Sequence, residues 1–189
     1  MAHFTALYDA CVLYPAPLRD LLMRLALTDR FRAKWTNDIH EEWMSNLLKN
    51  RPDLTRVRLE RTRDFMNNSV RDGLVEGYHY LIPGLALPDE NDRHVVAAAM
   101  HARADVIVTF NLKDFPRDVL APLHIEAQHP DEFICHLIDL DKAAVVIAAQ
   151  KCRAALKNPP KSAEDYLDTL ERQSLPNTVA ALREFAAVL

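Results

Sequence analysis

The chain has 189 residues, enough for one well-buried domain with an appendage but too few for two full domains. Hydrophobic residues make up 49% and charged residues 26% of the sequence, as in ordinary globular proteins. The formal net charge of −4 gives no global argument for nucleic-acid binding, so any such argument must come from local patches.

Several common classes of site are excluded by what the sequence lacks. The three glycines do not form the loops that bind nucleoside triphosphates or dinucleotides, and neither an esterase-type serine elbow nor a zinc-protease histidine pair is present. The three cysteines are far apart and in no metal-ligand spacing, which predicts free thiols in a reducing compartment. No secretory signal is visible, and no uncharged run reaches the roughly 18 residues that span a bilayer. We therefore expect a soluble, cytoplasmic protein that does not contact membranes.

Strand and helix patterns alternate through the first two thirds of the chain. The run 105–110 is the clearest strand, because its apolar, β-branched residues form a continuous series typical of a strand covered on both faces. Alternation of this kind predicts an α/β fold: three α/β/α layers around a mostly parallel sheet with right-handed crossovers. The predicted strands are 4–8, 31–35, 105–110 and 123–127. The predicted helices are 18–27, one capped by Asn37 or Asp38, one beginning at Pro52, and one opened by Asp92.

After residue 129 the pattern changes to helices alone. Apolar stripes recur at helical spacing, and prolines at 159, 160 and 176 separate them. We therefore place one domain at 1–129 and an all-helical C-terminal extension at 130–189. Isolated helices of this length are marginal in water, so we expect the extension to pack on a partner surface and to be dispensable for the chemistry.

Four acidic residues form the strongest chemical pattern in the sequence. Because strand ends and helix starts meet at one edge of a parallel sheet, we expect these acids to converge there. A cluster of carboxylates repels itself unless a hard divalent cation neutralises it, and Mg²⁺ and Mn²⁺ prefer such oxygen ligands. A cation held in this way suits the cleavage of a phosphodiester. The four acids are Asp9, Glu42, Asp92 and Asp114.

Each acid also has an ordinary structural explanation. Asp92 could stabilise a helix N-terminus, Glu42 could belong to a solvated helix face with Glu41, and Asp114 could be a turn residue. Asp9 directly follows a predicted buried strand and must have a partner, because unpaired burial of charge is unfavourable; a nearby arginine could provide it. From the residues alone both explanations remain open.

In their order and context, the acids resemble those of the PIN-domain ribonucleases, and more narrowly the VapC-type toxins of bacterial toxin–antitoxin pairs. The matching segments are LYDACVL at 7–13, Glu41-Glu42-Trp43, Asp92 with its alanine-rich helix, and ADVIVTFNLKDF at 104–115. They extend over roughly residues 3 to 128. The C-terminal part resembles a helical extension found in one subgroup of these proteins.

The resemblance implies a metal-dependent endoribonuclease that acts as the toxin of such a pair. Asp9 and Asp92 would ligate Mg²⁺ or Mn²⁺, and Glu42 and Asp114 would complete the site directly or through water. The implied partners are an RNA substrate and a cognate antitoxin, and a homodimer is left open.

The sequence departs from the family pattern at two positions. Many relatives carry an acid at the position of Asn111, and a threonine or serine at the position of Cys11. Asn111 therefore leaves an alternative function open, a catalytically weakened PIN module that binds RNA or protein. Of the two adjacent acids we prefer Glu42 to Glu41, because the family pattern places an acid directly before an apolar residue, here Trp43.

The sequence fits two other families of α/β proteins less well. A haloacid-dehalogenase-type phosphatase would need an aspartate at position 11, where this chain has a cysteine, and a receiver domain would need an early acid pair that is missing. The histidines His40, His94 and His101 are near the acids in sequence. We expect them on helix faces rather than among the metal ligands, because Mg²⁺ favours oxygen.

A basic segment is the best candidate for RNA contact. Between Lys49 and Arg71 there are seven Lys and Arg residues against three acids, in a protein of negative net charge. The ordinary alternative is a solvated helix face on which arginines pair with Glu60 and Asp64. The candidate RNA-binding residues are Arg51, Arg56, Arg58, Arg61 and Arg63.

Overall fold

A computed structural model describes residues 4–189, which form two compact units. The first, here called the sheet unit, consists of Met1–Tyr14 and Phe31–His129. The second, the helical unit, consists of Pro15–Arg30 and Pro130–Leu189. In the described part of the chain, no helix has both the length and the apolar character that a membrane span requires.

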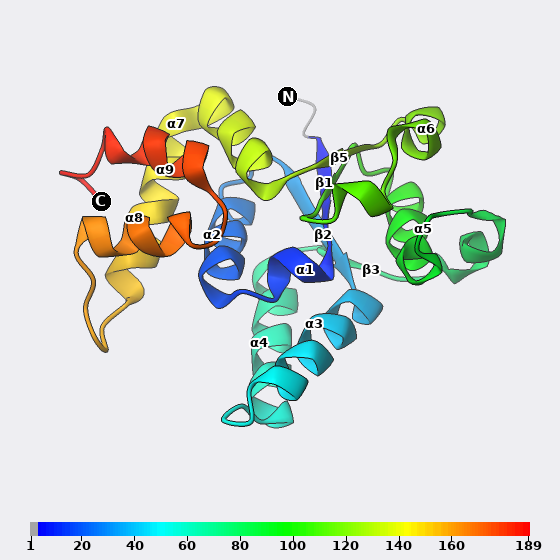
Figure 1. Cartoon of the computed structure of the whole chain (residues 1–189), viewed down its shortest axis with the longest axis horizontal. Helices are drawn as coiled ribbons and strands as arrows, with labels where there is room; N and C mark the ends of the chain where they lie inside the picture. Colours follow the sequence, from blue (N-terminus) through cyan, green and yellow to red (C-terminus); the bar gives the residue numbers. More distant parts are fainter. Residues whose placement is uncertain (1–3) are drawn as a thin grey trace. The chain divides into compact units, whose positions relative to one another are not determined.

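A five-stranded parallel sheet in the order β3-β2-β1-β4-β5 organises the sheet unit (Figure 1). In register, Ala6 of the central strand pairs with Ala33 on one side and Val106 on the other. The two middle strands β1 and β4 are buried along their whole length, as their continuous apolar runs predicted. The strands are β1 (Thr5–Tyr8), β2 (Arg32–Thr36), β3 (Leu74–Val75), β4 (Val106–Val108) and β5 (Glu126–Gln128).

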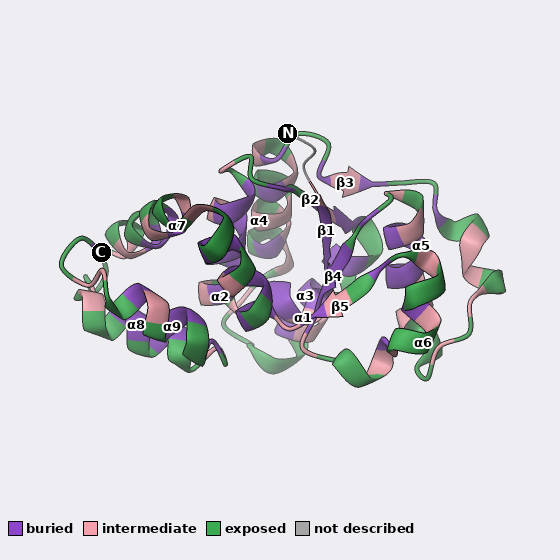
Figure 2. Ribbon diagram, turned by 90° about the horizontal axis from the view of Figure 1, so that it is seen from above, coloured by how far each residue is buried: buried purple, intermediate pink, exposed green. Residues whose placement is uncertain are grey.

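Helices cover both faces of this sheet, which confirms the predicted α/β fold with its parallel sheet. Helices α4 and α5 lie on opposite sides of the strands, and the strands between them are mostly buried (Figure 2). The helices are α1 (Ala10–Leu13), α3 (Asn37–Asn50), α4 (Arg56–Ser69), α5 (Arg93–His101) and α6 (Arg117–Leu120). Short 3-10 turns are η1 (His79–Gly84), η2 (Glu90–Asp92), η3 (Leu112–Asp114) and η4 (Ala121–Leu123).

Two predicted helix starts were wrong. Helix α3 is capped by Thr36, not by Asn37 or Asp38, because the Thr36 hydroxyl accepts a hydrogen bond from the backbone N–H of Ile39 at 3.0 Å. Helix α4 begins after Thr55, whose hydroxyl accepts from the N–H of Arg58 at 3.3 Å, so Pro52 lies in the preceding loop. In both cases a threonine at the end of an extended segment replaces the residue chosen from the sequence.

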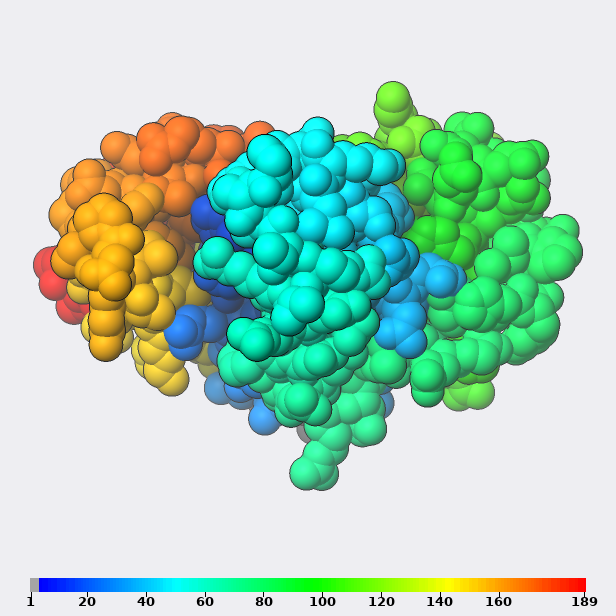
Figure 3. All heavy atoms as spheres, turned by 90° about the horizontal axis from the view of Figure 1, so that it is seen from below, coloured from blue at the N-terminus to red at the C-terminus, as the bar shows by residue number. Residues whose placement is uncertain are grey.

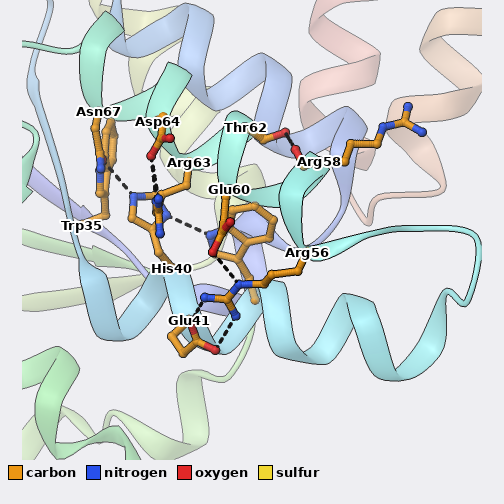
Figure 4. Close-up of polar contacts among 11 residues, drawn as sticks. Trp35, His40, Glu41, Arg56, Arg58, Glu60, Thr62, Arg63, Asp64 and Asn67 are labelled. Atoms are coloured by element: carbon orange, nitrogen blue, oxygen red, sulfur yellow. Dashed lines mark hydrogen bonds and ion pairs between the residues drawn. The ribbon is translucent and has the colours of Figure 1, made fainter.

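A buried polar network joins α3 and α4 to β2 (Figure 4). The indole N–H of Trp43 donates to His40 Nδ1 at 3.1 Å, so the proton of His40 is on Nε2, which faces Asn67 Oδ1 at 3.0 Å. The indole N–H of Trp35 donates to the same amide oxygen at 2.7 Å. His40 is fully buried, and burial lowers its pKa to about 4. His40 is thus on a helix face, as expected, but on a buried face of α3 and not at the surface.

The helical unit is built from α2 (Ala16–Ala26), α7 (Pro130–Ala155), α8 (Ala163–Glu171) and α9 (Pro176–Arg183). Helix α2 packs against α7 and α8, although the sequence placed it in the domain 1–129. The reason is its apolar stripe, which is fully buried within this unit: Leu18, Leu21, Leu22 and Leu25. Helix α7 changes direction at Asp141, whose φ of −155° is not helical.

One buried carboxylate connects the start of α7 to the start of α9. Asp131, near the start of α7, is 4% exposed. Its oxygens accept hydrogen bonds from the backbone N–H groups of Asn177 at 3.0 Å and Thr178 at 2.8 Å. These N–H groups belong to the first turn of α9, so Asp131 neutralises the positive end of that helix from another helix.

Candidate active site

Asp9 directly follows the central strand β1 and is 3% exposed. Its Oδ1 accepts from the N–H of Ala10 at 2.6 Å and so caps the short helix α1. Its Oδ2 accepts from the Thr109 hydroxyl at 2.7 Å and the Cys11 thiol at 3.1 Å. Burial raises the pKa of Asp9 despite these hydrogen bonds. The partners of Asp9 are thus neutral groups, and the alternative of an arginine partner is not what the structure contains.

Cys11 and Thr109 form a small hydrogen-bonded group around this carboxylate. Their side-chain atoms are 3.3 Å apart, and the backbone N–H of Phe110 donates to the Cys11 sulfur at 3.3 Å. The Thr109 hydroxyl also accepts from the N–H of Asn111 at 3.0 Å. The end of β4 is therefore connected to Asp9 through two side chains, which fixes the orientation of the carboxylate.

Of the two adjacent acids on α3, Glu42 is the one that faces Asp9. Its carboxylate interacts electrostatically with Asp9 and Asp92 and is 3.6 Å from Nε2 of His94. Glu41 instead receives two hydrogen bonds from Arg56 of α4, at 2.7 and 2.6 Å (Figure 4). These bonds, with one from Ser45, lower the pKa of Glu41 to about 2.

Asp92 is at the N-cap position of α5 but makes no capping hydrogen bond with its side chain. Asp89 caps the preceding turn η2, because its side chain accepts from the N–H of Asn91 at 2.9 Å. Burial, followed by the charges of four acids, raises the pKa of Asp92 to about 7. The four acids are Asp9, Asp89, Asp114 and Glu42.

Asp114, in the turn η3 after β4, is partly buried and belongs to this electrostatic group through Asp92. Asn111 is exposed, and its backbone N–H is used by Thr109. Within residues 4–189, neither Asp9, Asp92 nor Asp114 forms an ion pair with a basic side chain. Four acids from four separate elements therefore interact with one another, and one basic group, His94, lies beside Glu42.

The donor set is chemically suited to a hard divalent cation, because it consists of carboxylates whose charge is not compensated. Their side chains are not drawn together to coordination distance: among the described residues, no three His, Cys, Asp or Glu side chains form a metal-binding group. The arrangement thus fits a cation through its charge and its ligand type, and an ion bound there would have to bring the carboxylates closer.

His94, expected from the sequence to lie on a helix face, is on α5 beside Glu42, at the edge of this site. Burial opposes a charge on its ring, but the hydrogen bond and charge of Glu42 outweigh this effect and its pKa is raised. Its Nδ1 is buried without a hydrogen-bond partner among residues 4–189. The spacing of two residues from Asp92 was visible in the sequence, but which way the ring points depends on the start of α5.

The five predicted RNA-binding arginines fall into two groups. Three of them are held by acids: Arg51 by Asp53 at 2.7 Å, Arg56 by Glu41 and Glu60, and Arg63 by Asp64 at 2.8 Å. Arg58 and Arg61 are exposed and form no ion pair within residues 4–189. The alternative of a solvated helix face with paired charges therefore describes Arg51, Arg56 and Arg63, but not Arg58 and Arg61.

Comparison with known proteins identifies the family. Residues 5–113 match the family model described as PIN domain. The chain belongs to the PIN-domain family. Residues 130–184 match the VapC50 C-terminal domain, so the chain has the VapC-type architecture with a C-terminal extension. It is 39% identical over 116 residues, 61% of this chain and 68% of the relative, to the provisionally named ribonuclease VapC50 of Mycobacterium tuberculosis. No solved structure gives a significant match.

Proposed function

We propose that this protein is a metal-dependent endoribonuclease that hydrolyses RNA phosphodiester bonds and acts as the toxin of a toxin–antitoxin pair. The observation that carries the proposal is the mutual electrostatic interaction of Asp9, Glu42, Asp92 and Asp114, from four elements of a PIN-domain fold, in which neither Asp9, Asp92 nor Asp114 has an ion pair among residues 4–189. Membership of the VapC type and the name of the M. tuberculosis relative support RNA as the substrate.

In this proposal Asp9 and Asp92 hold Mg²⁺ or Mn²⁺, and Glu42 and Asp114 complete the site directly or through water. When bound, such an ion polarises a phosphate and lowers the pKa of a water. Thr109 and Cys11 keep the Asp9 carboxylate in place through their hydrogen bonds to Oδ2. His94, 3.6 Å from the Glu42 carboxylate, positions that side chain by its charge. Asn111 and Glu41 are left outside the ligand set.

The test compares two aspartates three residues apart. Asp92→Asn should abolish Mg²⁺- or Mn²⁺-dependent cleavage of RNA while leaving the thermal unfolding temperature within a few degrees of the parent. Asp89→Asn is the matched control: it removes the same charge next to the site but leaves the proposed ligands intact, and cleavage should persist. Full activity of Asp92→Asn, or no cleavage by the parent with either metal, would contradict the proposal and favour the binding-only alternative.

The toxin role has its own test. Expression of the protein alone should arrest growth, expression of Asp92→Asn should not, and co-expression of a cognate antitoxin should relieve the arrest. The antitoxin is expected to bind over the acidic site, because a lone active ribonuclease would harm its host. Normal growth with a parent protein that cleaves RNA in vitro would separate the nuclease from the toxin role.

A further inference from the structure

Helix α4 presents an outward face that the candidate active site does not use. Four residues lie on it, here called the α4 stripe: Val57, Arg58, Arg61 and Phe65. Their spacings of three, four and seven residues place them on one side of the helix. Phe65 is 68% exposed and Val57 is 57% exposed, whereas Leu59 and Met66 on the opposite side are buried. The outer sides of α3 and α4 together form one face of the sheet unit (Figure 3).

The charges on this stripe are not those of an ordinary salt-bridged helix. Arg56 and Arg63 of the same helix are held by acids, as Figure 4 shows. In the same view the Arg58 side chain points away from that cluster. Arg58 and Arg61 are exposed and without an ion pair among residues 4–189. Two exposed arginines without an ion pair therefore precede an exposed aromatic ring on one side of the helix, and the acid beside that ring, Asp64, is paired with Arg63.

The composition of the α4 stripe suits single-stranded nucleic acid better than a partner helix. A partner helix would need a continuous apolar seam at i, i+3, i+4 and i+7, and the stripe interrupts its two apolar residues with arginines. Single-stranded nucleic acid needs separate cations for its phosphates and a ring face for its bases. Val57 and Phe65 are eight residues apart, about 12 Å along a helix. Two guanidinium groups without an ion pair complement the charge of phosphates, and this favours single-stranded nucleic acid over a partner helix.

We propose that the α4 stripe is a binding surface for single-stranded RNA, a proposal that rests on the proposed function for its choice of RNA. Arg58 and Arg61 bind two phosphates, and one base stacks on Phe65. The surface would hold substrate outside the acidic site and so contribute to affinity rather than to the chemical step.

The experiment measures binding separately from cleavage. The full chain with Asp92→Asn serves as parent, so that RNA stays intact, and a fluorescein-labelled single-stranded RNA of about ten nucleotides is titrated at several salt concentrations. Arg58→Gln/Arg61→Gln should lower the slope of log affinity against log salt by about 1.4, since each phosphate contact on a single strand contributes about 0.7. Phe65→Ala should weaken binding roughly 5- to 150-fold, the range of one base stacked on a ring. Arg51→Gln is the matched control, because Asp53 already holds that arginine, and its slope should not change.

Three outcomes overturn the proposal: no binding by the parent at low salt, variants that bind like the parent, or an equal loss in Arg51→Gln. If stripe variants lose antitoxin binding but keep RNA binding, the surface belongs to a protein partner and the proposal is wrong. Cleavage by the otherwise wild-type chain is measured in parallel. If RNA binding depends on the stripe but the chain does not cleave RNA, the stripe proposal is supported and the proposed nuclease activity is wrong. If the stripe variants cleave and bind RNA like the parent, the nuclease activity is supported and the stripe proposal is wrong.

Discussion

A buried carboxylate needs partners, and Asp9 has them in a hydroxyl, a thiol and a backbone N–H rather than in a cation. Neutral donors fix the position of its oxygens but leave its charge in place. Asp92 likewise has no basic partner in the described chain, and its side chain makes no capping hydrogen bond to α5. At the residue scale, the site is therefore a group of interacting carboxylates, with the exposed Glu42 beside His94 at its edge.

The two adjacent glutamates give the sharpest comparison at this scale. Glu42→Gln should lower RNA cleavage by roughly 10- to 100-fold, because Glu42 faces Asp9 and Asp92. Glu41→Gln removes an exposed pair with Arg56, which contributes little to stability, and cleavage should remain within a few-fold of the parent. The measurement is the RNA cleavage rate of the two variants and the parent at saturating Mn²⁺. An inactive Glu41→Gln beside an active Glu42→Gln would show that the wrong carboxylate was chosen.

His40 makes stability depend on pH. Its pKa is about 4 in the folded protein and near 6.5 when unfolded, so between these values the unfolded chain binds more protons. Stability is thus complete above pH 6.5 and is lost as the pH falls toward 4. The expected loss between pH 7 and pH 5 is about 2 kcal/mol, measured by urea unfolding.

The matched variants for this prediction are two histidine-to-glutamine changes. In His40→Gln the amide can accept from Trp43 and donate to Asn67 without titrating, so the loss between pH 7 and pH 5 should become smaller. His101→Gln, at an exposed position, should keep the loss seen in the parent. A His40→Gln variant with unchanged pH dependence would assign the effect to other groups.

At the scale of elements, the strands in the middle of the sheet were predictable, whereas two other short elements, α1 and β3, were not. The central strands β1 and β4 were predicted from continuous apolar runs, because burial on both faces leaves that pattern in the sequence. Helix α1 has four residues and strand β3 has two, too few for any period to be recognised. The start of α4 was misplaced because a proline can occupy a loop as well as a first turn.

The candidate site shows the same limit. Acids that follow strands were predictable because strand ends meet at one sheet edge. The choice between Glu41 and Glu42 depends on the rotation of α3, which Arg56 influences from fifteen residues farther along the chain. The capping of the turn η2 by Asp89, and the lack of a capping hydrogen bond from Asp92 to α5, depend on the conformation of that turn. Contacts of this kind are set by tertiary packing and have no local pattern.

Asp131 provides the prediction at this scale. Asp131→Ala should destabilise the helical unit by about 2 kcal/mol, because two N–H groups at the start of α9 lose a charged acceptor in a buried place. Glu132→Ala is the control, since the neighbouring acid is exposed, and its effect should stay within about 0.5 kcal/mol. Urea unfolding followed by circular dichroism measures both. Equal stability of the two variants would mean that the cap contributes nothing.

At the scale of the whole molecule, the chain passes from one unit to the other three times, at residues 14/15, 30/31 and 129/130. The helical unit is therefore not a simple tail, since its α2 comes from the N-terminal part. The match of residues 130–184 to a separate family model covers only part of what packs together. That the extension is dispensable for the chemistry stays a prediction, but a test of it has to take α2 into account.

A chain that ends at His129 should aggregate, because α2 would lose α7 and α8 and expose its leucine stripe. A second truncation, with residues 15–30 replaced by a flexible glycine-serine linker, should be soluble and keep RNA cleavage. Size-exclusion chromatography and a cleavage assay measure the two properties. A soluble first truncation would show that α2 does not need the C-terminal helices, and a soluble but inactive second truncation would place part of the site in the helical unit.

The split origin of the helical unit also has a consequence for synthesis. Helix α2 leaves the ribosome early, but its partner α7 begins about 100 residues later, roughly 5–20 s at ordinary elongation rates. During that interval its leucine stripe has no native surface to cover it. The nascent chain is therefore expected to be a client of ribosome-associated chaperones until α7 and α8 have been made.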